Sequence, residues 1–282
     1  MSELGFGFLR LPRKNGAYDK SALCRMTDLF LERGGRYFDT CYTYLDGESE
    51  KAIRECLTER YGADCYTLAD KLPGYLCRSE ADAMRYFEES LRRCGTDRFD
   101  VYMLHWLNRE NLVYTERFDQ FGFLAELKKQ GLAERIGFSY HDSAALLDEI
   151  LTRHPEVDLV QIQLNYLDWD AAGIEAGKCY DACVRRNKSV VVMEPVKGGT
   201  LASLPEEAEA LLRAVHPDWS ASRWALNYAR SLPGVEVVLS GMSALGQVAE
   251  NTAGAQVLSA EEVRALEKAA EIINAKTAVA CT

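Results

Sequence analysis

Four side chains suited to proton transfer stand at regular places in the sequence. Asp39, Lys71 and His105 each follow a short apolar run, and Tyr44 lies shortly after Asp39. Each residue alone has a plainer explanation, such as a supporting ion pair or a core histidine. Together they indicate a functional site, provided that the fold brings them to one place.

The elements that must position these residues alternate along the chain. Eight apolar runs of strand length are separated by stretches of helical spacing: Leu4–Leu9, Arg36–Phe38, Cys65–Ala69, Phe99–Leu104, Arg135–Phe138, Asp158–Gln163, Ser189–Met193 and Glu236–Leu239. Residues 79–94 and 142–153 carry one-sided apolar stripes, and Ser79 with Asp82 has the spacing of a capping box. A last helix is expected over 259–274.

Eight strands, each followed by a helix, predict an α/β fold of the (β/α)8 TIM barrel class with an extra C-terminal helix. A doubly wound sheet is the alternative, but the turn after the first strand lacks the third glycine of a dinucleotide-binding loop. No Pro/Gly/Ser-rich linker divides the chain, so we expect one domain over 1–282. In such a barrel the strand ends meet at one mouth, where Asp39, Lys71 and His105 would converge.

Composition excludes several classes of function. The 282 residues carry 33 Lys+Arg and 43 Asp+Glu, a net charge of −10, which disfavours binding to nucleic acid. No apolar run approaches the roughly 20 residues of a membrane span, and no secretory signal is visible. Nine cysteines without a CxxC pair indicate reduced thiols and a cytoplasmic protein. The remaining histidines lack ligand-spaced neighbours, so no metal site is expected.

Several segments resemble the aldo-keto reductases. Asp39 and Tyr44 fall in a segment similar to that family's second-strand motif, and Leu68-Ala69-Asp70-Lys71 and Leu104-His105-Trp106 resemble its lysine and histidine strands. The segments 137–139, 160–162, 193–199 and 241–251 look like its cofactor-contacting segments. The resemblance covers nearly the whole chain, from about Leu4 to Asn251.

This resemblance implies hydride transfer between a nicotinamide and a carbonyl or alcohol carbon. Tyr44 would be the general acid, Lys71 would lower the pKa of Tyr44, Asp39 would hold Lys71, and His105 would orient the substrate oxygen. The cofactor, NADPH with NADH as an alternative, would contact Gly7, Ser139, Gln161, Met193, Glu194, Val196, Gly198, Gly199, Gly241, Gln247, Glu250 and Asn251. The small-molecule carbonyl substrate would meet Phe8, Tyr75 and Trp106; protein partners are not indicated.

The sequence departs from the family pattern at four places. Asp70 stands where Thr is usual, Met193 replaces an aromatic residue, and the usual N-terminal hairpin is nearly absent. The segment 241–251 has no basic residue for a 2′-phosphate, which leaves Arg10 or Lys197 to compensate from elsewhere. The tail, with Cys281-Thr282, resembles the start of an iron–sulfur segment in one branch of the family, so we expect a longer native protein.

Two other classes of function stay open on the residues alone. A regulatory barrel would bind nicotinamide and sense redox state without significant turnover, and it would keep the same four residues. A barrel lyase or isomerase would use Lys71 as a Schiff-base amine, but Tyr44 would then have no role. Turnover of generic aldehydes and quinones, and trapping of substrate on Lys71, distinguish these alternatives.

Overall fold

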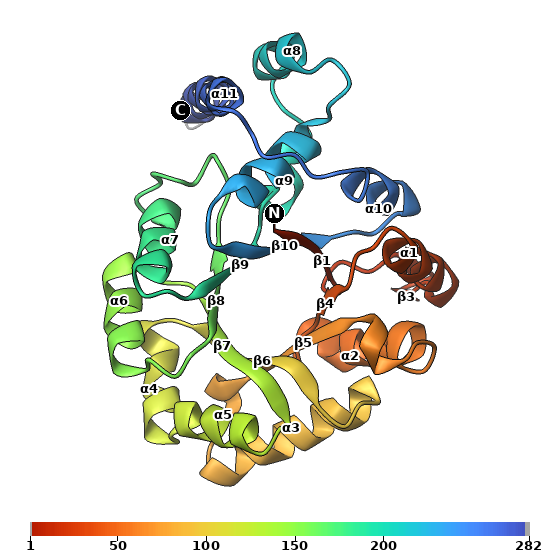
Figure 1. Cartoon of the computed structure of the whole chain (residues 1–282), viewed down its shortest axis with the longest axis vertical. Coiled ribbons are helices and arrows are strands. Elements are labelled where there is room, and N and C mark those ends of the chain that lie inside the picture. Colours follow the sequence, from red (N-terminus) through yellow and green to blue (C-terminus); the bar gives the residue numbers. More distant parts are fainter. Residues whose placement is uncertain (1, 280–282) are drawn as a thin grey trace.

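Eight parallel strands close into a barrel in the order β1-β10-β9-β8-β7-β6-β5-β4, surrounded by helices (Figure 1). This computed structural model describes residues 2–279. The strands are β1 (Glu3–Gly7), β4 (Tyr37–Asp39), β5 (Thr67–Leu72), β6 (Phe99–Leu107), β7 (Ala133–Tyr140), β8 (Leu159–Gln163), β9 (Ser189–Met193) and β10 (Val235–Gly241). The predicted (β/α)8 class is confirmed, and each of the eight expected runs contributes a barrel strand.

Helices cover the outside of the barrel between successive strands. The α-helices are α1 (Lys20–Glu32), α2 (Glu48–Ile53), α3 (Glu80–Cys94), α4 (Arg109–Arg117), α5 (Gln120–Lys129), α6 (Ala144–Arg153), α7 (Ala176–Arg185), α8 (Glu206–Val215), α9 (Ala221–Ser231), α10 (Leu245–Asn251) and α11 (Ala260–Val279). Shorter turns are η1 (Tyr44–Gly47), the π-helical η2 (Arg54–Thr58), η3 (Ala63–Cys65), η4 (Gly74–Leu76) and η5 (Lys197–Ala202). The expected capping box of Ser79 and Asp82 starts α3. Within residues 2–279, no helix has the length and apolarity to cross a membrane.

The twofold alternation of side chains along the strands decides what reaches the barrel mouth. One set of inward residues fills the interior: Tyr37, Ala69, Val101, Met103, Leu159, Val191, Val237 and Leu239. The next inward position on a strand lies two residues further toward its carboxyl end. These positions hold Asp39, Lys71, His105, Gln161, Met193 and Gly241. The barrel register therefore gathers the polar residues above an apolar plug.

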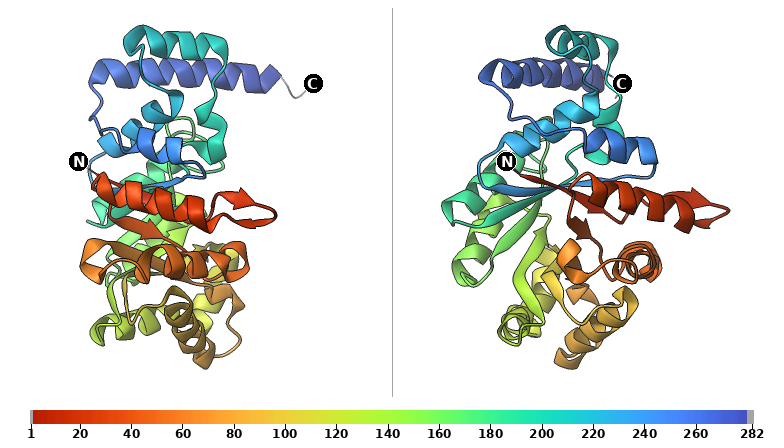
Figure 2. Two further views of the ribbon diagram at one scale, coloured as in Figure 1. Left: turned by 90° about the vertical axis from the view of Figure 1, so that its right-hand side faces the viewer. Right: turned by 45° about the vertical axis from the view of Figure 1, so that its right-hand side comes forward.

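Two features lie outside the eight repeated units. A short hairpin of β2 (Arg13–Lys14) and β3 (Ala17–Tyr18) follows β1, and its turn residues Asn15 and Gly16 have φ values of 53° and 87°. The sequence patterns did not predict this hairpin. At one end of the molecule, α8 and α11 lie side by side (Figure 2) and enclose a second apolar cluster around Trp224 and Leu266. Cys281, on which the iron–sulfur expectation depends, lies outside the described residues.

Candidate active site

A buried ion pair forms the floor of the site. Lys71 Nζ donates to Asp39 Oδ1 at 2.6 Å and to the Thr40 carbonyl at 2.8 Å. The Lys71 side chain is 0% exposed and that of Asp39 is 3% exposed. Burial alone would lower the pKa of Lys71, but the Asp39 charge outweighs it and raises this pKa. Lys71 is therefore a fixed positive charge, and two of its three ammonium protons are donated to Asp39 and Thr40.

The ring of Tyr44 lies over the Lys71 ammonium group, on the side of the cavity. The chain turns sharply directly after Tyr44, where Leu45 and Asp46 adopt φ values of 52° and 54°. This turn brings the Tyr44 ring centroid to 5.0 Å from Lys71 Nζ and 5.6 Å from the ring centroid of His105. Burial raises the pKa of the phenol, and the Lys71 charge lowers it by less. The expectation that Lys71 brings this pKa below its ordinary value is therefore not met: the phenol keeps its proton at neutral pH.

His105 is held by a residue that the sequence patterns did not single out. Its Nδ1 lies 3.2 Å from Cys41 Sγ and 3.5 Å from Thr43 Oγ1. Burial, and then the charge of Lys71, lower the pKa of His105 to about 3, so the imidazole is neutral. When the Cys41 thiol donates to Nδ1, the proton of the ring resides on Nε2. Cys41 looked like a small apolar residue in sequence because only the tertiary fold places it against His105.

A cavity of about 290 Å³ opens above these residues. Asp39, Tyr44 and His105 line it together with Gly7, Ser139, Gln161, Met193, Glu194 and Gly241. Leu9 and Trp106, which are 43% and 47% exposed, form its apolar rim. Tyr75 packs edge-on against Trp106 at 5.6 Å between centroids. Phe8 does not face this cavity: it is 0% exposed and packs against Phe6 and Phe38 outside the barrel interior, so its expected place in the substrate pocket is wrong.

One wall of the cavity carries polar groups that can form further hydrogen bonds. The strand β6 is irregular between Leu104 and Leu107, where Trp106 has a φ of 57°. The Trp106 amide donates to Ser139 Oγ at 2.7 Å, so the hydroxyl proton of Ser139 is free for another acceptor. Gln161 is 2% exposed, and its Oε1 has no hydrogen-bond partner among the described residues. A buried orphan acceptor indicates a place for a ligand donor.

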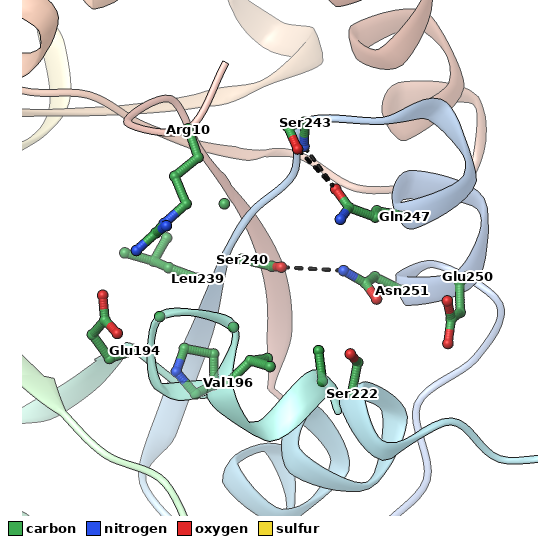
Figure 3. Close-up of a pocket in the computed structure, with 15 residues that line it drawn as sticks. Arg10, Glu194, Val196, Ser222, Leu239, Ser240, Ser243, Gln247, Glu250 and Asn251 are labelled. Atoms are coloured by element: carbon green, nitrogen blue, oxygen red, sulfur yellow. Dashed lines mark hydrogen bonds between the residues drawn. The ribbon is translucent and has the colours of Figure 1, made fainter. Parts of the chain in front are cut away.

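A second cavity, of about 270 Å³, continues from the first along β10 and α10 (Figure 3). Both cavities share Arg10, Glu194, Leu239 and Gly241 as lining residues. Val196, Gly198 and Gly199 form one side, and Gln247, Glu250 and Asn251 form another, which places the remaining expected cofactor residues here. Gly198 and Gly199 have φ values of 63° and 103°, a conformation that favours glycine and leaves the loop backbone uncovered.

The charges around the second cavity are unevenly placed. Arg10 is the cation among the residues that line this cavity, and Figure 3 shows its side chain extending into the hollow with the guanidinium end toward Glu194. Lys197 does not take part, because its ammonium group is paired with the buried carboxylate of Asp168. Of the two cations considered for phosphate binding, the structure thus leaves Arg10 available. Glu250 adds a negative charge at the far end.

Asp70, the residue next to Lys71 in sequence, faces outward behind β5. Its carboxylate, that of Glu50 and the Cys94 thiol have ligand atoms within 4.8 Å of one another, and all three are buried. Glu50 Oε2 is already paired with Arg93 Nη1 at 2.8 Å. Burial and the Glu50 charge raise the pKa of Asp70 well above its ordinary value. The group is therefore a buried structural cluster in which burial and the Glu50 charge favour the protonated form of Asp70, and it lines neither cavity.

The same geometry argues against Lys71 as an amine nucleophile. A Schiff base requires a neutral amine that reaches the substrate. Here the ammonium is fully buried, paired with Asp39 and protonated. Tyr44 lies between it and the cavity.

Comparisons with known proteins agree with this arrangement. The sequence profile described as "Aldo/keto reductase family" matches residues 3–271. An uncharacterized oxidoreductase of Bacillus subtilis, YqkF, is 26% identical and is aligned over 95% of this chain and 92% of its own length. A solved aldo-keto reductase from Bacillus halodurans, AKR11C1 in its holo form, is 27% identical, with a TM-score of 0.76 over 95% of this chain and 91% of that one.

More distant structures share the fold. An aldo-keto reductase from Klebsiella pneumoniae, solved in complex with NADPH, is 20% identical and superposes with a TM-score of 0.71 over 94% of this chain and 89% of that one. The matched profile covers nearly the whole barrel, including every strand that carries a residue of the site. The chain is therefore an oxidoreductase that belongs to the aldo/keto reductase family.

Proposed function

We propose that the chain reduces a small carbonyl compound with NADPH, and that Tyr44 supplies the proton. The observation that carries this proposal is a protonated phenol held at a cavity mouth by a buried lysine and a neutral imidazole. Carbonyl reduction creates an alkoxide, which needs a proton donor close to the reacting carbon. When bound, NADPH supplies the hydride.

The residues of the first cavity fit the nicotinamide end of that cofactor. The orphan Oε1 of Gln161 can accept from a carboxamide NH2 group, and the free hydroxyl proton of Ser139 can donate to a carboxamide oxygen. Gln161 is itself held by its Nε2 contact with Met193 Sδ at 3.6 Å. These residues would fix which face of the ring is presented. Met193 supplies a polarizable thioether where the family usually has an aromatic ring.

The proton-transfer residues divide their tasks by charge. Tyr44 donates its proton to the substrate oxygen, and the adjacent Lys71 charge stabilises the tyrosinate that remains. Asp39 keeps Lys71 charged and oriented through the 2.6 Å contact. His105, neutral and protonated on Nε2, donates a hydrogen bond to the same oxygen and orients it. Burial of Lys71 and Asp39 strengthens their interaction because water is excluded.

The second cavity would take the phosphate and adenosine part. Arg10 and the uncovered backbone at Gly198 and Gly199 suit a pyrophosphate, and Asn251 lies further along, where it donates to Ser240 Oγ at 3.1 Å. The apolar rim of Leu9 and Trp106, with Tyr75 packed against Trp106, favours a partly apolar carbonyl substrate. We place this reaction in the cytoplasm, where NADPH is available and free thiols stay reduced.

Two measurements test the proposal. Fluorescence titration of the purified chain with NADPH should show saturable binding, and a panel of aldehydes and quinones should be reduced with consumption of NADPH. Binding without turnover of any carbonyl would favour the regulatory barrel, and absence of binding would contradict both. Gln161→Leu should weaken binding of NADPH, because the orphan acceptor is removed while the volume of the side chain is kept.

A further inference from the structure

Two cysteines face each other across the α1–η2 contact, on the outside of the barrel and away from both cavities. Cys24 on α1 and Cys56 in the π-helical turn η2 have sulfur atoms 3.1 Å apart. The other described cysteines with a polar contact meet oxygen or nitrogen groups instead, as Cys41 does with His105 and Cys94 with Asp70. We propose that Cys24 and Cys56 form a redox-active dithiol that a low-molecular-weight disulfide, such as oxidised glutathione, converts reversibly to a disulfide.

Ion pairs on both sides hold the two sulfur-bearing elements together. Lys20 Nζ lies 2.9 Å from Glu55 Oε2 at one side, and Arg60 Nη1 lies 2.8 Å from Asp28 Oδ1 at the other. These pairs join α1 to η2 and to the residues just after it.

Arg60 also bridges the two cysteine backbones directly. Its Nη1 donates to the Cys56 carbonyl at 3.1 Å and to the Cys24 carbonyl at 3.4 Å. Disulfide formation needs the sulfur atoms to approach to roughly 2.05 Å, a further movement of about 1 Å. A π-helical turn is an irregularity in the helix that is frequently found at functional sites. Only a small movement of the Cys24 and Cys56 side chains is therefore needed to form the disulfide.

The different burial of the two thiols sets the order of the chemistry. Cys24 is half-buried and Cys56 is fully buried, so the external disulfide reaches Cys24 first. The Cys24 thiolate attacks one sulfur of oxidised glutathione, forms a mixed disulfide and releases one glutathione thiolate. Cys56 then attacks the Cys24 sulfur and releases the second glutathione, which takes up the proton of Cys56. The sum is one protein dithiol plus one glutathione disulfide giving one protein disulfide plus two glutathione thiols.

The bond would tie together the ends of the segment that carries half of the proposed catalytic group. Residues 24–56 include β4 with Asp39, the turn with Tyr44, and α2. Cross-linking Cys24 to Cys56 closes this segment into a loop and restricts it in the unfolded chain. The oxidised protein should therefore unfold at a higher temperature than the reduced protein.

The test maps thiols in the intact chain rather than measuring activity, so it does not depend on the proposed reductase function. The reduced protein is incubated with defined ratios of reduced and oxidised glutathione, quenched with acid, alkylated, digested and analysed by mass spectrometry. We expect a Cys24–Cys56 peptide pair that has lost two hydrogens and that a thiol reductant restores. The half-buried Cys65, which contacts no other sulfur among the described residues, reports that the oxidant has reached ordinary thiols.

Two variants separate this mechanism from simple thiol modification. Cys56→Ser should stop at the glutathione adduct of Cys24, because no second thiol can displace it. Cys183→Ser, a matched removal of a buried thiol on α7, should leave the Cys24–Cys56 disulfide unchanged. A Cys24 adduct that persists in the unaltered protein would overturn the proposal, as would reduced Cys24 and Cys56 under conditions that modify Cys65.

Discussion

Replacing Tyr44 by phenylalanine isolates the proton that the proposed reaction needs. The substitution keeps the ring. Its centroid therefore stays 5.0 Å from Lys71 Nζ and 5.6 Å from the ring centroid of His105. Only the hydroxyl is lost, so the free energy of unfolding should change by about 1 kcal/mol or less. Loss of a positioned acid typically lowers the rate about 10²–10⁴-fold, or roughly 2.7–5.4 kcal/mol of activation free energy. The variant should therefore fold normally and reduce carbonyls very slowly.

The assay follows NADPH consumption with an activated aldehyde at saturating cofactor. A parallel fluorescence titration should show little change in the affinity for NADPH, because Tyr44 faces the substrate side of the cavity. Tyr42→Phe is a matched control: it removes a phenol that donates to Glu89 at 2.8 Å outside the cavity. Near-normal turnover of Tyr44→Phe with an unchanged fold would refute the assignment and favour the regulatory barrel.

Combining this change with Lys71→Met tests whether the two residues act through one proton transfer. Lys71→Met alone should also cripple turnover, since the tyrosinate left after proton donation loses its stabilising charge. It leaves Asp39 buried without its partner, which costs about 3–5 kcal/mol of folding stability, so its fold must be checked by thermal unfolding. The double variant should be no slower than the slower single variant. Losses that multiply would show that Lys71 acts independently of Tyr44.

Four further predictions concern neighbouring groups. Burial lowers the pKa of His105 to about 3, so between about pH 6.5 and 3 the unfolded chain binds more protons than the folded protein, and the free energy of unfolding should fall as the pH falls. His105→Asn should reduce this pH dependence, measured by chemical denaturation, by up to about 1.4 kcal/mol per pH unit. The pKa of Asp70 is raised in the folded protein, so Asp70 keeps a proton there that the unfolded chain loses as the pH rises, and this lowers stability at higher pH. Asp70→Asn, whose amide can donate to Glu50, should therefore raise the melting temperature more at pH 7 than at pH 4. Preference for NADPH over NADH should stay within about tenfold, roughly 1.4 kcal/mol, and Glu250→Gln should increase it in paired titrations; a preference of several hundredfold would reveal a phosphate clamp elsewhere. Cys41→Ala should lower kcat/KM about tenfold by freeing Nδ1 of His105, and Cys41→Ser should retain most of it, as steady-state pH profiles would show.

The sequence by itself determined the barrel and the strand ends that carry chemistry. Apolar runs of strand length alternate with helical stripes, and this local pattern is enough to predict eight strands and the helix that begins with Ser79 and Asp82. The positions of Asp39, Lys71 and His105 followed because a parallel barrel gathers the carboxyl ends of its strands at one mouth.

Tertiary structure decided how these groups are charged and what surrounds them. Burial, which no local pattern reports, keeps the pKa of Tyr44 high despite Lys71, against the expectation from the sequence. The side to which a residue faces depends on its register in the strand. Phe8 therefore packs in the outer core, whereas the next residue, Leu9, lies at the cavity. Contacts between distant segments place Cys41 against His105, pair Lys197 with Asp168, and bring Cys24 to Cys56. Each of these contacts joins side chains that neither spacing nor composition relates, because proximity between segments distant in the sequence is a property of the closed fold.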